Sequence, residues 1–292
     1  MNPDLSVCIV NWNTRDLLDA CLSSLRDNAG DLALEVIVVD NASADGSADM
    51  VRERHPAVTL VANSENRYYA AGNNQALTLA RAPHKLLLNP DIVVPAGALA
   101  TLLEFLADHP RAGAVAPRLR EPDGTVQLSC RTFPGPAAVW SEALGLSRLW
   151  PRHPVFGAYR MAWWDYNSVR PVDQPMASAL LLRGAALDEV GLFDEQFPMF
   201  FNDVDLCRRL WDAGWQVWFT AAAELVHVGG ASTRQVRREM ILESHRSLTA
   251  YYRKHYRARL DPLTYGLTVG LAKLGLWVRL LVHAIRGGKG RA

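Results

Sequence analysis

The strongest constraint on the fold is the alternation of short apolar runs with helical segments between residues 6 and 88. Runs typical of buried strands occupy residues 6–10, 34–40, 58–62 and 85–88. The segments between them carry apolar residues at helical spacing, as at Leu18, Leu22 and Leu25, and a further helix is predicted over 71–81. Strands and helices that alternate through short connections are typical of a parallel sheet covered by helices on both faces. The sequence therefore predicts an α/β fold.

Polar side chains gather where these predicted strands end. They are Asn11, Asp40, Asn63, Asn66, Asn89 and Asp91. In open α/β sheets, ligands bind at the carboxyl ends of the strands. Asn and Asp also favour ordinary turns, which is the alternative for any one of these residues. Because they follow four successive strands, we interpret them as a binding site.

The sequence lacks the usual glycine loops that bind phosphate. Neither a Walker lysine pattern nor G-x-G-x-x-G occurs, so a phosphorylated ligand would need a metal ion instead. Asn89-Pro90-Asp91 follows an apolar strand and offers the oxygen ligands that a hard cation prefers. The alternative is a proline turn with a solvated Asp91.

A second polar cluster lies at residues 202–203, before a segment with the apolar spacing of a helix. Asn202 is predicted to cap this helix, and Asp203 falls in its first turn. The helix dipole favours an ionised carboxylate there, so Asp203 is a candidate proton acceptor at neutral pH. The alternative is that both residues only cap the helix.

The charge is distributed unevenly along the chain. Residues 230–292 contain thirteen Lys and Arg against three carboxylates, a local charge of +10 in a chain of net charge +1, so residues 1–229 sum to −9. A helix is predicted from Arg234 to Tyr256. Residues 263–285 are largely apolar but contain Lys273, Arg279 and His283, which favours an amphipathic helix on an anionic membrane over one that spans it. The alternative is packing on the chain's own domain or in a homodimer.

Two further features bear on location and on sugar binding. The four cysteines are scattered, and the N-terminal residues lack a basic and apolar leader, so we expect a cytoplasmic protein with reduced thiols. The stretch 118–175 has little periodicity but contains Trp140, Trp150, Trp163 and Trp164. These tryptophans are candidates for sugar stacking, although packing is their commoner role.

Seven motifs occur in a fixed order along the chain. They are Val10-Asn11-Trp12-Asn13, 38–47 (VVDNASADGS), Glu65-Asn66 with 70–74 (AAGNN), 88–91 (LNPD), 191–195 (GLFDE), 202–206 (NDVDL) and 227–232 (HVGGAS). This set resembles the inverting family 2 glycosyltransferases, especially the bacterial rhamnosyltransferase-like branch, from about residue 5 to residue 256.

The resemblance implies a GT-A fold, in which a Rossmann-like, mostly parallel central sheet is flanked by helices. A glycosyltransferase domain would cover residues 1–233, with a donor-binding half at about 1–117 and an acceptor-binding half at about 118–233. A basic helical extension would cover 234–292.

The resemblance also implies roles for single residues. Asp40 would accept a hydrogen bond from N3–H of uracil or thymine, with Asn11 and Asn66 near the nucleotide. Asp91 and His227 would hold Mg²⁺ or Mn²⁺ against the diphosphate of the donor. Asp203 would be the base that takes a proton from the acceptor hydroxyl.

The implied activity is inverting transfer of a sugar, L-rhamnose from dTDP-rhamnose, to a lipid-linked or polysaccharide acceptor in cell-surface glycan synthesis. It would take place at the inner face of the cell membrane. The alternatives are a UDP-hexose-dependent transferase and a catalytically silent protein that binds nucleotide sugars. A nucleic-acid-binding role rests on the basic tail alone and lacks any recognition motif.

Three positions depart from the family pattern. Asn89 replaces the first Asp of the metal-binding D-x-D motif, which removes a charge from the expected metal site. Asn202 stands where the family usually has Glu before the base. Arg67-Tyr68-Tyr69 replaces a small turn that contains glycine, and this places Arg67 as a candidate contact to the donor phosphates.

Overall fold

A computed structural model gives the structure of residues 2–229 and 237–288, with the backbone alone for Arg237 and 282–288. Part of the last motif (230–232), the start of the helix predicted from Arg234, and the boundary between residues 233 and 234 lie outside these described residues, as does the side chain of His283.

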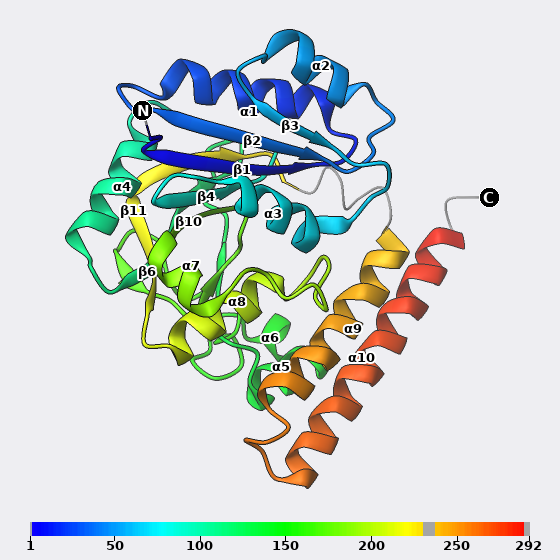
Figure 1. Ribbon diagram of the computed structural model, residues 1–292. Coiled ribbons are helices and arrows are strands. Elements are labelled where there is room, and N and C mark those ends of the chain that lie inside the picture. Colours follow the sequence, from blue (N-terminus) through cyan, green and yellow to red (C-terminus); the bar gives the residue numbers. More distant parts are fainter. Residues whose placement is uncertain (1, 230–236, 289–292) are drawn as a thin grey trace.

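The centre of the described molecule is a nine-stranded sheet with the order β3-β2-β1-β4-β10-β6-β11-β5 and β8 paired to β11 (Figure 1). Its strands are β1 (Leu5–Asn11), β2 (Leu34–Asp40), β3 (Thr59–Ala62), β4 (His84–Leu88), β5 (Ile92–Val93), β6 (Ala112–Arg120), β8 (Arg170–Pro171), β10 (Ala179–Arg183) and β11 (Gln216–His227). Strands β1 to β4 are parallel, which confirms the predicted α/β fold class. Strand β10 runs antiparallel to β4 and β6, so the sheet becomes mixed in its second half. The short strands β7 (Cys130–Arg131) and β9 (Gln174–Pro175) form a separate pair.

Helices cover both faces of the sheet and form two apolar cores with it. One core contains side chains of α1 (Arg15–Asn28), α2 (Ser47–Arg54) and α4 (Ala98–Asp108). The other contains side chains of α3 (Tyr68–Leu79), α7 (Gly184–Val190) and α8 (Asn202–Asp212). Alternate residues of β1 enter opposite cores, Val7 and Ile9 the first and Cys8 the second, because side chains alternate along a strand. The chain is therefore layered helix, sheet, helix, as the sequence predicted.

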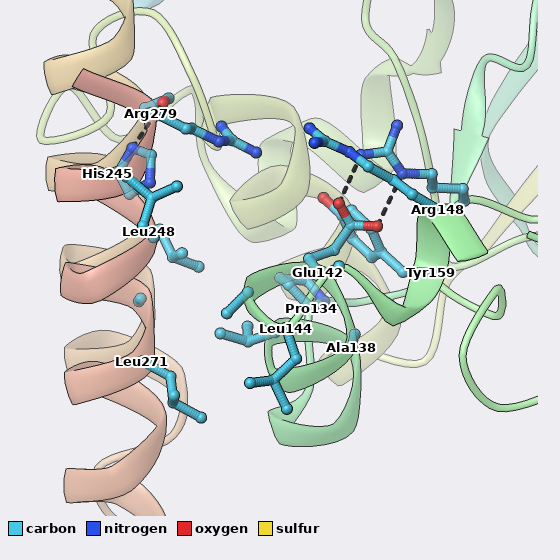
Figure 2. Close-up of a pocket in the computed structure, with 18 of the residues that line it drawn as sticks. Pro134, Ala138, Glu142, Leu144, Arg148, Tyr159, His245, Leu248, Leu271 and Arg279 are labelled. Carbon is cyan, nitrogen blue, oxygen red and sulfur yellow. Dashed lines mark hydrogen bonds and ion pairs between the residues drawn. The ribbon is translucent and has the colours of Figure 1, made fainter. Parts of the chain in front are cut away.

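The C-terminal part forms a pair of long helices, α9 (Arg237–His255) and α10 (Pro262–Gly288), which lie side by side against α5 (Pro136–Ala143) (Figure 1). A third core of Val139, Val204, Tyr251, Tyr252 and Ala272 joins these helices to α8. The indole N–H of Trp140 donates to Thr268 Oγ1 (2.8 Å), so this tryptophan serves packing between α5 and α10. The short helix α6 (Leu146–Leu149) follows α5, and a cavity remains between this region and α10 (Figure 2).

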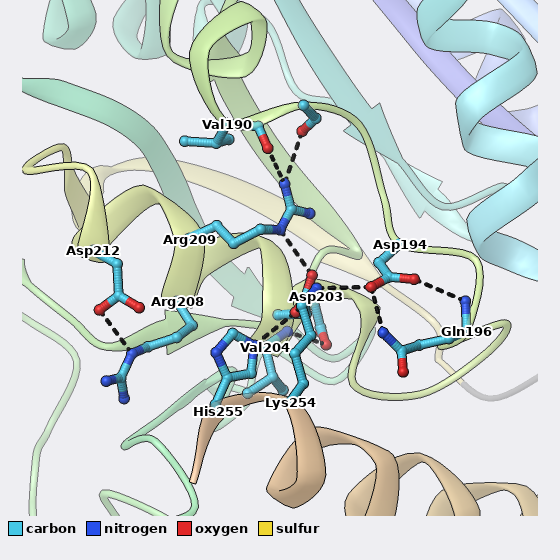
Figure 3. Close-up of polar contacts among 12 residues, drawn as sticks. Val190, Asp194, Gln196, Asp203, Val204, Arg208, Arg209, Asp212, Lys254 and His255 are labelled. Atoms are coloured by element: carbon cyan, nitrogen blue, oxygen red, sulfur yellow. Dashed lines mark hydrogen bonds and ion pairs between the residues drawn. The ribbon is translucent and has the colours of Figure 1, made fainter. Parts of the chain in front are cut away.

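The buried carboxylate of Asp205 ties α8 to α9. It accepts hydrogen bonds from Arg209 Nε (2.8 Å) and His255 Nε2 (2.7 Å), and Lys254 Nζ lies 2.7 Å away. Figure 3 shows the side chains of Arg209, His255 and Lys254 converging between α8 and α9. Lys254 also contacts Asp194 (2.7 Å), so the loop before α8 joins the same network. Burial by itself raises the pKa of Asp205, but the hydrogen bonds from His255 and Lys254 and the charge of Arg209 outweigh it and lower that pKa.

Replacing Asp205 by asparagine is expected to lower the free energy of unfolding by about 2–4 kcal/mol, because Arg209 and Lys254 lose the buried charge that neutralises them. Since the pKa of Asp205 is lower in the folded chain than in the unfolded chain, this stabilisation is present at neutral pH. It is lost as the pH falls below about 4 and through the lowered pKa. Urea unfolding of both proteins across this pH range measures the difference.

Asp212→Asn is the matched control on the same helix, because its exposed carboxylate pairs with Arg208 and Arg259 at the surface. Its expected cost is about 1 kcal/mol or less. Equal losses for the two variants, or a difference between wild type and Asp205→Asn that persists unchanged at pH 3, would contradict the assignment.

Candidate active site

A cavity of about 490 Å³ opens where β1, β4 and β11 end and α8 begins. Its lining comes from eight stretches of the chain: Val10 and Trp12; Asn41; Asn66, Tyr68 and Tyr69; Asn89, Pro90 and Asp91; 176–178; 199–200, Asn202 and Asp203; His227; and Glu239 and Met240. Parallel strands present their carboxyl ends at one edge of a sheet, and this brings distant polar residues together.

The cavity unites five of the predicted site residues: Asn66, Asn89, Asp91, Asp203 and His227. The structure thus brings together the candidate base and both candidate metal ligands of the sequence analysis. The individual roles of these residues stay predictions.

Asn11 and Asp40 lie behind the cavity rather than in its lining. Both are buried, and Asn11 Nδ2 donates to Asp40 Oδ2 (2.8 Å) and to Ser43 Oγ (3.1 Å). The other oxygen of Asp40 accepts the backbone N–H of Ser43 (2.9 Å). Their neighbour Asn41 does line the cavity. Arg67 is exposed at the residue before α3 and is not among the lining residues, so its predicted phosphate contact stays a prediction.

Asp91 and His227 meet because Ile92 pairs with His227 across β5 and β11. Both side chains are buried, and Asp91 Oδ1 lies 3.2 Å from His227 Nε2, yet neither atom has a hydrogen-bond partner. His227 Nδ1 contacts Gln127 Oε1 (2.8 Å), and the amide N–H₂ of Gln127 donates to His227 O and to Glu121. This contact assigns the imidazole proton to Nδ1 and leaves Nε2 as an acceptor, close to the carboxylate of Asp91.

Two acceptor atoms this close together repel each other unless a proton or a cation binds both. The oxygen and nitrogen donors of Asp91 and His227 therefore fit a divalent cation such as Mg²⁺ or Mn²⁺. In the described part of the chain, no third His, Cys, Asp or Glu completes a metal cluster. Magnesium sites commonly have few protein ligands and fill the rest with substrate phosphates and water, so the pair still suits an ion that binds with a diphosphate.

Asp203 lies in the first turn of α8, and its carboxylate accepts the N–H of Val204 (2.8 Å) and, at 3.4 Å, that of Ala177. The hydroxyl of Tyr69 donates to Ala177 O (2.7 Å) and so fixes this part of the wall. Burial raises the pKa of Asp203, and this effect outweighs the hydrogen bonds that lower it. The sequence analysis considered only the helix dipole, which acts in the opposite direction.

The start of α8 also differs from the prediction. Phe201, at φ 66°, precedes the helix, and Asn202 is its first residue rather than its cap. The amide of Asn202 instead accepts the N–H of Asp203 (2.7 Å) and donates to Phe197 O (3.3 Å). The prediction was wrong because the backbone of a bulky residue rarely adopts the left-handed conformation that Phe201 has here.

Backbone strain is concentrated around this cavity. Of the six non-glycine residues with positive φ in the described chain, Asn13, Ala42, Tyr68 and Phe201 lie on loops that border it or its buried floor. Such conformations persist only where surrounding contacts hold them, as when Asn41 Nδ2 donates to Tyr68 O (3.0 Å). The site is thus shaped by fixed loops.

Sequence reasoning missed several lining residues. Trp12 was inside a recognised motif but had received no role. Met176 and Ser178 lie between β9 and β10, in a connection to which the sequence analysis gave no role. Glu239 and Met240 belong to α9 and reach the cavity only through tertiary packing, for which the sequence gave no local signal.

Comparisons with known proteins agree with the motifs. The model of the family described as "Glycosyl transferase family 2" matches residues 6–165. The chain is 34% identical over 244 residues to N-acetylglucosaminyl-diphospho-decaprenol L-rhamnosyltransferase of Mycobacterium tuberculosis, covering 80% of this chain and 78% of that protein. It is 27% identical over 236 residues to the O-antigen biosynthesis protein RfbC of Myxococcus xanthus, covering 80% of this chain but only 18% of that one.

Among solved structures, the fold is similar to the mannosyltransferase PcManGT from Pyrobaculum calidifontis, determined in complex with GDP-Man and Mn²⁺. The TM-score is 0.59 at 19% sequence identity, over 99% of this chain and 80% of that chain. This similarity confirms the predicted GT-A fold.

Asp91→Asn is expected to weaken Mn²⁺ binding in the presence of dTDP by about tenfold or more, because the neutral amide is a poorer ligand for a hard cation. Asn89→Asp is expected to strengthen it, since a second carboxylate would face the same cavity. The electron paramagnetic resonance signal of free Mn²⁺ measures both affinities. Asp108→Asn, at the exposed end of α4, is the control. An unchanged affinity for Asp91→Asn would remove this residue from the metal site.

Proposed function

The chain belongs to glycosyl transferase family 2, and from this premise we propose that it is an inverting, metal-dependent transferase. It would move L-rhamnose from dTDP-rhamnose to a lipid-linked acceptor in cell-surface glycan synthesis. One observation carries the proposal: Asp203, suited to accept a proton, lines the same cavity as Asp91 and His227, suited to hold a cation. The 34% identity to a rhamnosyltransferase that acts on a decaprenyl diphosphate sugar supports the transferred sugar and the acceptor class.

In the proposed reaction, Asp203 takes the proton of the acceptor hydroxyl as the oxygen attacks the anomeric carbon. A general base works best when its pKa approaches the working pH, so the raised pKa of Asp203 suits this role. The Ala177 and Val204 N–H groups hold its carboxylate in place. Attack from the face opposite the departing diphosphate inverts the configuration of the sugar.

The donor diphosphate would lie near Asp91 and His227, which are the residues that fit a divalent cation. When bound, that cation neutralises the negative charge that develops on the departing diphosphate. Asn89 contributes a neutral amide to the same wall, so the chain itself supplies one carboxylate rather than two.

Nucleotide recognition is proposed for the buried floor beneath the cavity. Asp40 already accepts from Asn11 and Ser43, one bond on each oxygen, and each carboxylate oxygen has a second acceptor position. That position would accept N3–H of thymine or uracil, with Asn66 on the adjoining wall. This donor in the base does not distinguish the two pyrimidines.

The deciding experiment is an assay of donor hydrolysis, without acceptor, over a panel of dTDP-rhamnose, UDP-glucose, UDP-galactose and UDP-N-acetylglucosamine. Turnover of dTDP-rhamnose is expected. Turnover of UDP-hexoses alone would exclude rhamnose as the transferred sugar and favour the UDP-hexose alternative. Donor binding without hydrolysis or transfer would support the catalytically silent alternative. The neutral residues Asn89 and Asn202, where the family has carboxylates, suggest this alternative.

Asp203→Asn is expected to lower kcat for transfer by about two to four decades while donor affinity changes little, because only the proton acceptor is lost. In the wild type, activity should fall as the pH drops through the raised pKa of Asp203, so this limb lies above the 3.8 of an ordinary aspartate. Steady-state kinetics against pH measure both effects. Asp212→Asn on the same helix is the control. An Asp203→Asn variant with wild-type activity would rule out Asp203 as the general base.

Association with the membrane surface is the second part of the proposal. No helix in the described residues combines the length and apolarity needed to cross a bilayer. One side of α10 nevertheless exposes an apolar stripe at Leu263, Leu267, Leu274, Trp277 and Leu281. The exposed Lys273 flanks it, which suits a helix lying on the anionic inner face of the cell membrane. The alternative is that the stripe joins two copies of the chain.

Trp277→Ser is expected to weaken pelleting with phosphatidylglycerol vesicles by roughly tenfold, since burial of one large apolar side chain contributes about 1.5–3 kcal/mol. Leu79→Ser, an exposed apolar residue on α3, is the control. Pelleting that is equal for both variants, together with a wild-type dimer in analytical ultracentrifugation that Trp277→Ser dissociates, would assign the stripe to a homodimer instead.

A further inference from the structure

A second cavity, of about 420 Å³, lies between the α5–α6 region and the C-terminal helices (Figure 2). Its walls are largely apolar, with Val139 and Leu144 on one side and Leu248, Leu271 and Val278 on the other. Val278 is also half-exposed, so the cavity continues onto the surface next to the apolar stripe of α10. None of the residues assigned above to donor or metal binding lines this second cavity.

One end of the second cavity carries a surplus of positive charge. Arg148, Arg160 and Arg279 line it, and Glu142 is its one lining carboxylate. Glu142 is occupied by Arg160, which binds both of its oxygens (2.8 and 2.5 Å). In the described chain, Arg148 and Arg279 make no ion pair with a carboxylate. Figure 2 shows both guanidinium-bearing side chains on the same side of the cavity, away from Leu271.

The second cavity adjoins the first through the turn before α8. Phe201 lines the second cavity, whereas its neighbours Phe200 and Asn202 line the first together with Asp203. Tyr159 lines the second cavity too, and burial chiefly raises the pKa of its phenol. The charge of Arg131 lowers that pKa and the charge of Asp203 raises it, so Tyr159 lies within electrostatic reach of the candidate base.

We infer that the second cavity binds the prenyl diphosphate part of the acceptor, an inference that rests on the proposed function. The diphosphate would lie at Arg148 and Arg279, and the apolar chain would follow the walls of α5 and α10 toward the membrane-facing stripe. The sugar of the acceptor would then extend past Tyr159 toward Asp203. The occupant must be anionic at one end and apolar along the rest, which matches the distribution of charge in this cavity.

Gly275 allows the cavity to be filled without disturbing the helix. A Cβ added at Gly275 meets no atom within 4 Å, and the residue lines the cavity. Leucine forms helix better than glycine, so Gly275→Leu should fold while occupying space meant for the prenyl chain. Gly266→Leu is the matched control, because a Cβ there also meets nothing within 4 Å and the residue lies on α10 outside the cavity.

The test is calorimetric binding of farnesyl diphosphate to the full chain, without donor. Gly275→Leu is expected to weaken binding about tenfold or more, and Gly266→Leu to leave it unchanged. Arg279→Gln should weaken it similarly, whereas Lys273→Gln, an exposed cation on the same helix outside the cavity, should not. Equal binding of farnesyl diphosphate by Gly275→Leu and Gly266→Leu would overturn the inference. Competition by phosphatidylglycerol that is as strong as competition by unlabelled farnesyl diphosphate would also overturn it.

A transfer assay separates this inference from the proposed function. With a sugar diphosphate acceptor on a prenyl chain, Gly275→Leu should raise KM about tenfold, while transfer to the same sugar diphosphate on a short alkyl chain should not change. Normal transfer to both acceptors by Gly275→Leu would overturn the inference and leave the function intact. If the wild type transferred no sugar at all, the function would fail, and the binding assay would still decide what the cavity holds.

Discussion

The carboxylate of Asp205 is the contact on which the positions of the functional groups depend. It holds α8 to α9 through Arg209, Lys254 and His255, and Arg209 also donates to the backbone carbonyls of residues 190–192. The first turn of α8 carries Asp203 and, with Phe201, forms the partition between the two cavities. Any tilt of α8 would therefore move the candidate base and this partition together. Full burial of a charge is costly, and here three partners offset the cost.

The polar groups of the candidate active site are unfavourable for the fold taken alone, and the sheet compensates for them. Asp91 and His227 place two unpartnered polar atoms 3.2 Å apart, and Asp203 is a carboxylate whose pKa burial has raised. These arrangements would relax if the surrounding backbone could move. The parallel strands β1 to β4, with apolar cores on both faces, keep that backbone in place. Stability thus comes from the layers of the fold, and reactivity from groups at the edge of its sheet.

The first half of the chain could be predicted from sequence because its information is local. Strand β2 has the bounds that the apolar run gave, and the residues after β1, β2 and β4 occupy the expected edge. The start of α3 was predicted three residues late, because Tyr68 enters the helix with a left-handed backbone that no propensity anticipates.

The second half was less predictable because its contacts are between segments distant in sequence. The tryptophans of 118–175 had two possible roles, and tertiary packing places Trp140 against α10 and stacks the buried Trp164 on Tyr166. The apolar content of 263–285 indicated an amphipathic helix, and α10 is one, yet nothing in the sequence indicated that α5 would cover one side of it and leave a cavity.

The arrangement of α9 and α10 also brings Glu239 and Met240 to the first cavity, whose other walls come from residues 10–227. During synthesis, this cavity therefore lacks one wall until residues 239 and 240 have left the ribosome and α9 has docked on the sheet domain. Nascent chains that end before residue 239 hold an incomplete cavity, although the sheet and both of its apolar cores are already encoded.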